Sequence, residues 1–309
     1  MKLERYGEMI ENWEEYRIVN DSLQRLVSNA DTLPKVKKAL QHLIKAGGKR
    51  TRPIIVLLSG KLAGGDYETV LDMAMAVELI HTASLAHDDI IDRGVVRRNV
   101  ETLNVKYDPS LAMLVGDWLI SKSVELTSKY GPEVVRNFAR TGMMMSEGEI
   151  LDVYSITDDF GEEEYFRCIE LKTASLFAYS ARNAYKFISG DNSKSEKMYQ
   201  YGFNLGIAYQ LVDDLLEYLE IFEDKKSEFE SLTLPLLLER TFGFKESVHR
   251  VLELIKKFTE KSKRALESFP SSEAKEKLLY LVDYMTVNMI KNYVSKNREV
   301  ISILEAHYP

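Results

Sequence analysis

The chain has 309 residues, of which 45% are hydrophobic and 29% are charged, with 7 prolines, 16 glycines and a single cysteine. Its 41 basic and 48 acidic residues give a net charge of −7, which argues against a general nucleic-acid-binding protein. The lone Cys168 excludes an internal disulfide framework and a cysteine-rich metal site. The N-terminal residues are too charged for a signal peptide, and no run approaches the ~18 apolar residues of a membrane span. We therefore expect a cytoplasmic protein without a transmembrane segment.

Long stretches with helical periodicity follow one another along the chain, and strand-like alternation bounded by hairpin signals is missing. The breaks between these stretches are short, and none has the composition of an interdomain linker. The sequence therefore predicts an all-α fold, a single domain over residues 1–309 with ten or more helices. The longest predicted helices cover residues 70–92, 110–130, 162–187, 198–222 and 244–269.

Two of these helices end in similar clusters of acidic residues, "LAHDDIID" and "YQLVDDLLE". In the first, Asp88 and Asp92 are four residues apart, so a helix places them on one face about 5–6 Å apart at Cβ. Asp213 and Glu217 repeat this spacing in the second. Carboxylates without His or Cys suit Mg²⁺, which also keeps waters and binds substrate phosphates. The alternative is that the acids simply pair with the nearby Arg93, Arg97 and Arg98.

A basic segment, "AGGKRTRP" at 46–53, precedes another apolar helix. Gly47 and Gly48 permit close approach of the backbone, and the start of a helix attracts anions. Lys49 and Arg52 are therefore candidates to hold a phosphate through charge-assisted hydrogen bonds. Together with the acidic clusters, the segment predicts one anion held by cations and a second held through metal ions.

The motifs "GGKRTRP", "ELIHTASLAHDDIID", "RGVVRRN" and "GIAYQLVDDLLE" occur in the order and spacing found in the trans-isoprenyl (polyprenyl) diphosphate synthases. The chain resembles this family, and its geranylgeranyl diphosphate synthases in particular, over about residues 40–240. The resemblance implies the isoprenoid synthase fold, a helical bundle around a central apolar cavity, usually in a homodimer. It also implies head-to-tail condensation of isopentenyl diphosphate with an allylic diphosphate, giving geranylgeranyl diphosphate or a longer product. Two or three Mg²⁺ ions, or Mn²⁺ in their place, would serve as cofactors.

The resemblance also implies a role for individual residues. Asp88, Asp92, Asp213 and Glu217 would bind the metal ions, with Asp89 and Asp214 supporting them. The site for isopentenyl diphosphate would comprise Lys49, Arg52, His81 and Arg98. The allylic diphosphate would contact Arg97, Lys172, Thr173, Gln210 and Lys226, with Lys172 also stabilising the departing diphosphate.

Small residues precede the first acidic motif. Ala83 and Ser84 stand where short-chain members of the family usually place bulky aromatic residues, which favours a product of twenty carbons or more. Ile80, or a residue of a facing helix such as Met113 or Trp118, would then set the floor of the cavity.

The chain departs from the family at Glu217, where an aspartate is usual, and in the segment that follows. Lys225 and Lys226 are the only basic candidates there, and the usual glycine is missing. Two alternatives therefore stay open: a non-catalytic partner subunit of a prenyl diphosphate synthase, or a class I terpene cyclase. A cyclase would not need the site formed by Lys49, Arg52 and Arg98.

Overall fold

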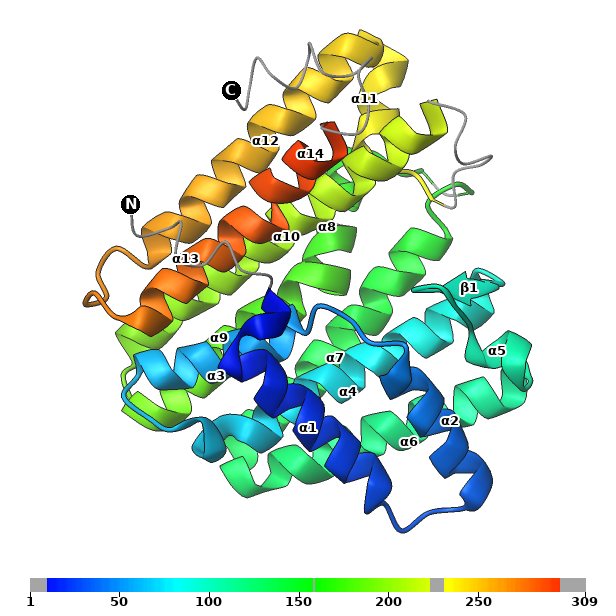
Figure 1. Ribbon diagram of the computed structural model, residues 1–309. Coiled ribbons are helices and arrows are strands. Elements are labelled where there is room, and N and C mark those ends of the chain that lie inside the picture. The colour runs from blue at the N-terminus through cyan, green and yellow to red at the C-terminus, as the bar shows by residue number, and fades with distance from the viewer. Residues whose placement is uncertain (1–9, 158, 223–230, 295–309) are drawn as a thin grey trace. The chain divides into compact units, whose positions relative to one another are not determined.

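The structure of the protein is a computed structural model, which describes residues 10–157, 159–222 and 231–294 (Figure 1). Helices account for nearly all of these residues, which confirms the all-α prediction and the expected number of helices. In chain order the helices are η2 (Ile10–Asn12), α1 (Glu14–Ser28), α2 (Pro34–Lys45), α3 (Thr51–Leu62), α4 (Tyr67–Ile91), α5 (Leu103–Lys106), α6 (Pro109–Thr127), η3 (Ser128–Tyr130), α7 (Pro132–Val153), α8 (Glu162–Ile169), η4 (Glu170–Ala174), α9 (Ser175–Ser189), α10 (Asn192–Phe222), α11 (Leu234–Phe242), α12 (Phe244–Ala265), α13 (Glu273–Met285) and α14 (Val287–Val294).

The chain divides into two compact units. The first contains the residues up to Ala139 together with Asn183–Gly190, and the second contains Arg140–Arg182 and the residues from Asp191 onward. Two of the boundaries fall inside α7 and α9, and the third falls between α9 and α10. A single synthase domain over residues 1–309 stays a prediction.

Helix α4 is the core helix of the first unit. Its sequence is apolar on most sides, as expected of a helix covered all round, and it packs against both α3 and α6. Among the described helices, α4 alone is long and apolar enough to cross a membrane, judged by length and composition. However, 61% of its most apolar 18-residue stretch is buried inside the protein. Its apolar character is therefore accounted for by the core. Gly60 of α3 lies against Val70, where a larger residue would collide.

A short hairpin follows α4 and was not expected from the sequence. Its strands β1 (Val96–Arg97) and β2 (Val100–Glu101) pair antiparallel, with Arg97 opposite Val100. The turn consists of Arg98 and Asn99, both with positive φ (54° and 63°), as a two-residue hairpin turn of the primed type requires. Arginine is uncommon in such a turn, so the hairpin was not predicted from the sequence.

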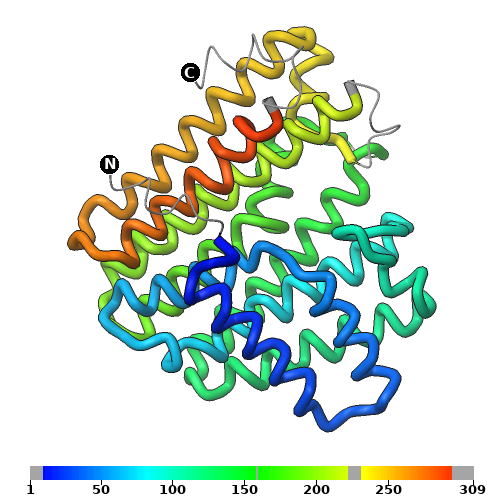
Figure 2. Tube along the Cα trace, in the orientation of Figure 1, coloured from blue at the N-terminus to red at the C-terminus, as the bar shows by residue number. Residues whose placement is uncertain are grey.

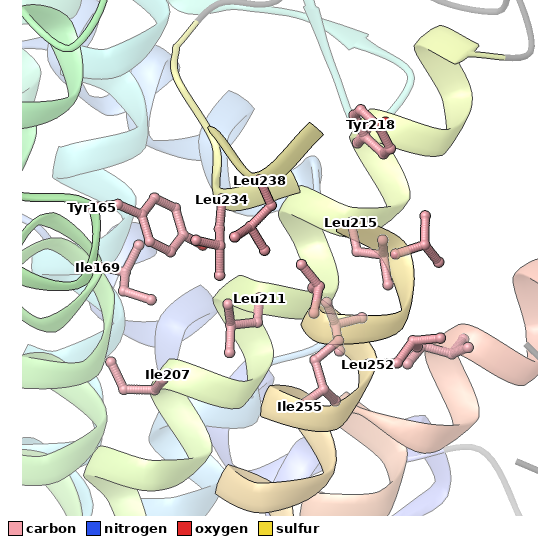
Figure 3. Close-up of a cluster of buried hydrophobic side chains, with 14 of the residues drawn as sticks. Tyr165, Ile169, Ile207, Leu211, Leu215, Tyr218, Leu234, Leu238, Leu252 and Ile255 are labelled. Carbon is pink, nitrogen blue, oxygen red and sulfur yellow. The ribbon is translucent and has the colours of Figure 1, made fainter. Parts of the chain in front are cut away.

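In the second unit, α10 lies beside α12, with α13 and α14 packed along them (Figure 2). Leucine and isoleucine side chains from α10, α11 and α12 fill the space between these helices (Figure 3). Tyr165 and Ile169 of α8 lie side by side at one edge of this hydrophobic cluster. The core thus fixes α10, the helix that carries the second acidic motif.

The predicted helix 162–187 is interrupted by a π-helical turn, η4, between α8 and α9. Two glycines of neighbouring helices make room for it. A Cβ atom at Gly148 of α7 would overlap the backbone of Lys172, and one at Gly206 of α10 would lie 2.5 Å from the Cα of Ala174. Single π-helical turns inside α-helices frequently occur at functional sites, and this one contains Lys172 and Thr173.

Candidate active site

The first acidic motif occupies the C-terminal end of α4. Asp92 is the residue that caps the helix, and its backbone N–H donates to the carbonyl oxygen of Asp88 at 2.8 Å. This confirms the predicted spacing of one helical turn between the two carboxylates. The C-terminal end of a helix carries partial negative charge, which disfavours carboxylates there. The position is therefore electrostatically costly without a cation.

Asp89, between these two residues, is buried and has a cationic protein partner. Arg97 of β1 donates from Nε and Nη2 to its Oδ1, both at 2.8 Å, and Asn104 donates to its backbone carbonyl oxygen. Partial burial opposes the charge of Arg97, but the hydrogen bond and the negative charge of Asp89 raise the pKa of Arg97 above its usual value. Asp89 is therefore paired with a neighbouring arginine, and its supporting role at a metal site stays a prediction.

The second acidic motif lies in α10, with Asp213 exposed, Asp214 buried and Glu217 half-buried. Asp214 accepts hydrogen bonds from the Tyr165 hydroxyl at 2.5 Å and from Gln210 Nε2 at 2.8 Å. Burial raises the pKa of Asp214 to about 7, because the loss of hydration outweighs these two hydrogen bonds. The second acid of this motif is therefore an internal group, as it is in the first motif.

Each unit thus presents two carboxylates one helical turn apart, Asp88 with Asp92 and Asp213 with Glu217. Among the residues that the structure describes, no group of three or more His, Cys, Asp or Glu side chains could hold a metal ion. One or two carboxylates, completed by waters and substrate phosphates, is the coordination that Mg²⁺ commonly has in proteins. The residues present therefore fit Mg²⁺ bound together with a diphosphate.

The predicted isopentenyl diphosphate residues all belong to the first unit, and two of them, Arg52 and His81, contact each other, while Arg98 contacts the basic segment at Gly47. Arg52 Nη1 lies 3.2 Å from Nε2 of His81, and Arg98 donates to the carbonyl oxygen of Gly47. Gly48 packs directly against the Arg98 guanidinium, leaving no room for a side chain. Lys49 is exposed in the same segment.

The imidazole of His81 is neutral in this environment. Desolvation, followed by the positive charges of Arg52, Arg98, Arg97 and Arg50, lowers its pKa well below the usual value. Since an arginine can only donate, the contact with Arg52 requires Nε2 of His81 to be the acceptor. The proton of the neutral ring is therefore on Nδ1.

In the second unit, Lys172 is held between two carboxylates that the sequence analysis had not identified. Its Nζ lies 2.7 Å from Glu149 and 2.5 Å from Asp152, both on α7. Desolvation would lower the pKa of Lys172, but the two carboxylates outweigh it and raise the pKa. The neighbouring Thr173 donates to Gln210 Oε1 at 2.7 Å. Thr173 and Gln210 are thus in contact beside Lys172, and their binding of the allylic diphosphate stays a prediction.

The residues predicted to determine chain length lie on α4. Ala83 and Ile80 are buried, and Ser84 is half-buried with its hydroxyl donating to the backbone carbonyl of His81. Met113 of α6 does not fit a cavity floor, because half of its side chain is exposed. Lys225 and Lys226 lie outside the described residues.

Comparison with known proteins identifies the family of the chain. Residues 33–267 match the family model described as polyprenyl synthetase. A geranylfarnesyl diphosphate synthase from Methanosarcina mazei is 42% identical over 283 residues, covering 92% of this chain and 96% of the relative. The crystal structure of a geranyltranstransferase from the same organism has a TM-score of 0.80 at 40% identity, covering 91% of this chain and 99% of that one. A geranylgeranyl pyrophosphate synthetase from Geoglobus acetivorans has a TM-score of 0.79 at 29% identity, covering 90% and 99%. The chain belongs to the polyprenyl synthetase family of Mg²⁺-dependent prenyltransferases, the prenyl diphosphate synthases.

Proposed function

We propose that the protein elongates an allylic diphosphate with isopentenyl diphosphate, head to tail and in the trans configuration, to a product of twenty or twenty-five carbons. The observation that carries the chain length is the pair of small residues, Ala83 and Ser84, directly upstream of Asp88 on α4. The 42% identical relative described as a geranylfarnesyl diphosphate synthase supports the longer product.

The two diphosphates would be recognised differently. Lys49, Arg52, His81 and Arg98 would bind isopentenyl diphosphate through cations and neutral donors; for His81 the available donor is Nδ1–H. For the allylic diphosphate we propose the contacts Arg97, Lys172, Thr173, Gln210 and Lys226.

When bound, Mg²⁺ neutralises negative charge that develops on the leaving diphosphate. Lys172 would add its ammonium group to this stabilisation, since its raised pKa keeps it protonated at neutral pH. Asp88, Asp92, Asp213 and Glu217 would hold two or three Mg²⁺ ions, for which Mn²⁺ would substitute. The family supports a homodimer of single-domain subunits in the cytoplasm, which we propose for this chain as well.

Incubation with Mg²⁺, farnesyl diphosphate and labelled isopentenyl diphosphate, followed by sizing of the products, tests the proposal directly. The expected product has twenty or twenty-five carbons. Failure to consume isopentenyl diphosphate, alone or with a copurified subunit, would refute it. Turnover only in the copurified complex would identify a partner subunit instead, and a cyclic hydrocarbon formed without isopentenyl diphosphate would identify a cyclase.

A substitution in α4 tests the basis for the chain length. Ser84 lies four residues before Asp88, so it is on the same face of the helix, about 6 Å further along the axis. Ser84→Phe is expected to shorten the main product by at least one isoprene unit. Leu85→Phe is the matched control, because the next position points about 100° away around the helix. Equal product lengths for wild type and Ser84→Phe would show that this face of α4 does not limit the chain.

A further inference from the structure

Arg50 lies inside the basic segment, between Lys49 and Arg52, but differs from these two cations in being buried. It is 5% exposed, whereas Lys49 is exposed and Arg52 is half-buried. Its backbone has the left-handed φ of 51° and forms the N-cap of α3. This conformation is unfavourable for a residue with a Cβ, so the surrounding contacts must maintain it.

The Arg50 guanidinium is bound on three sides by other elements of the first unit. Nη1 donates to Glu78 of α4, Nε donates to Asn20 Oδ1 of α1 at 3.1 Å, and Nη2 donates to the carbonyl oxygen of Ile44 of α2 at 3.4 Å. Glu78 is equally buried, with a side chain 5% exposed. The guanidinium therefore serves as an internal connection between three helices and is not available to a substrate.

The partners of Arg50 and Arg52 lie on the same face of α4. Glu78 and His81 are three residues apart on this helix, so their side chains are neighbours one turn apart. Arg50 contacts the first and Arg52 contacts the second. Two residues of the basic segment are thus held by two residues of α4 that lie one turn apart. These contacts determine where the segment lies along the helix.

We propose that Arg50 is a positioning residue for isopentenyl diphosphate, holding Lys49 and Arg52 in place through its contacts with Glu78 and Asn20. The inference rests on the proposed function, because it assumes that Lys49 and Arg52 bind this substrate. Placement matters because a displacement of about 1 Å at a binding group can cost up to a hundredfold in rate.

The ion pair itself gives a way to separate positioning from stability. Removing one member of a buried ion pair is strongly destabilising, since the other charge stays buried without a partner. Replacing both members with apolar residues of similar volume is often neutral or stabilising. If Arg50 only stabilised the fold, the double replacement would therefore restore a normal KM for isopentenyl diphosphate. If Arg50 positions the binding residues, this KM would stay raised.

The test compares Arg50→Met, the double variant Arg50→Met/Glu78→Leu and the wild type. The single variant should show a lowered urea midpoint, and the double variant should recover most of it. The double variant is still expected to raise KM for isopentenyl diphosphate roughly tenfold or more, with KM for the allylic substrate changed less than about twofold. A folded double variant with wild-type KM for isopentenyl diphosphate would overturn the inference.

Two further variants complete the design. Asn20→Ala removes the partner of Nε at a half-buried position and is expected to raise the same KM by about two- to fivefold while the protein stays folded. If the double variant does not fold, an unchanged KM in Asn20→Ala overturns the inference. Tyr201→Phe, which deletes a buried hydrogen bond to Leu278 in the second unit, is the control for lost stability and should leave this KM unchanged. Absence of condensation by the wild type would instead refute the proposed function.

Discussion

The buried carboxyl of Asp214 makes the stability of the second unit depend on pH in the direction opposite to most carboxylates. Its pKa is raised from 3.8 to about 7 by burial, which disfavours the ionised form. Asp214→Asn removes the titratable proton, while the amide still offers an acceptor to Gln210 Nε2. The comparison of wild type and variant therefore isolates the titration of one group.

The sign follows from the protons bound by each state. Between pH 3.8 and about 7 the folded state keeps the proton on Asp214, whereas the unfolded state has lost it. Protonation therefore stabilises the fold at low pH, and this contribution is lost as the pH rises through about 7. At 1.36 kcal/mol per pH unit, the whole interval corresponds to an upper limit of about 4 kcal/mol, most of which is lost between pH 5 and pH 8.

The assay is urea unfolding at pH 5 and at pH 8 in the presence of EDTA, so that no divalent cation binds near the motif. The free energy of unfolding of the wild type, measured relative to Asp214→Asn, should fall by up to about 3 kcal/mol between the two pH values. Glu220→Gln on the same helix is the matched control, because Glu220 is exposed and should leave the wild-type pH dependence in place. Identical pH dependence in wild type and Asp214→Asn would refute the assignment.

Two other substitutions test the metal site and the packing around Lys172. Asp88→Ala should abolish condensation while circular dichroism and the urea midpoint stay close to wild type; near-normal turnover would contradict the role of this carboxylate in binding Mg²⁺. Gly148→Ala introduces a methyl group that overlaps the backbone of Lys172, so it should lower the free energy of unfolding by about 1–3 kcal/mol and reduce kcat. Wild-type values of both for Gly148→Ala would show that α7 does not constrain the π-helical turn.

The parts of the site that were predictable from the sequence are those set by spacing along one helix. An apolar stretch that ends in acidic residues predicts a buried helix with a polar end, and the four-residue spacing of Asp88 and Asp92 places them on one face. The same reasoning located Asp213 and Glu217. Both helices extend further toward their N-termini than expected, which changes neither motif.

The remaining features depend on contacts between residues distant in the chain. Glu149 and Asp152 lie about twenty residues before Lys172, and no local pattern connects these acids with that lysine. Tyr165 precedes Asp214 by 49 residues, so the hydrogen bond between them could not be predicted from the sequence either. The hairpin turn at Arg98 and Asn99 was missed because arginine rarely adopts positive φ, and the π-helical turn leaves the sequence periodicity almost unchanged.

The two adjacent aspartates of each motif have different tasks, and helix geometry explains why. Successive residues point about 100° apart, so when the first aspartate faces the metal site, the second points toward the protein. Asp89 and Asp214 occupy these inner positions, held by Arg97 in one case and by Tyr165 and Gln210 in the other. The inner acid thus helps to fix its helix, and we propose that the residues at the first and fifth positions bind the cation.

This division limits the consequence of having a glutamate at the fifth position of the second motif. Glu217 is half-buried on α10, and its side chain is one methylene longer than that of aspartate. The anchoring of the helix depends on Asp214 and its two hydrogen bonds, which do not involve Glu217. A change at this position is therefore expected to alter the reach of the proposed metal ligand without disturbing the placement of Asp213.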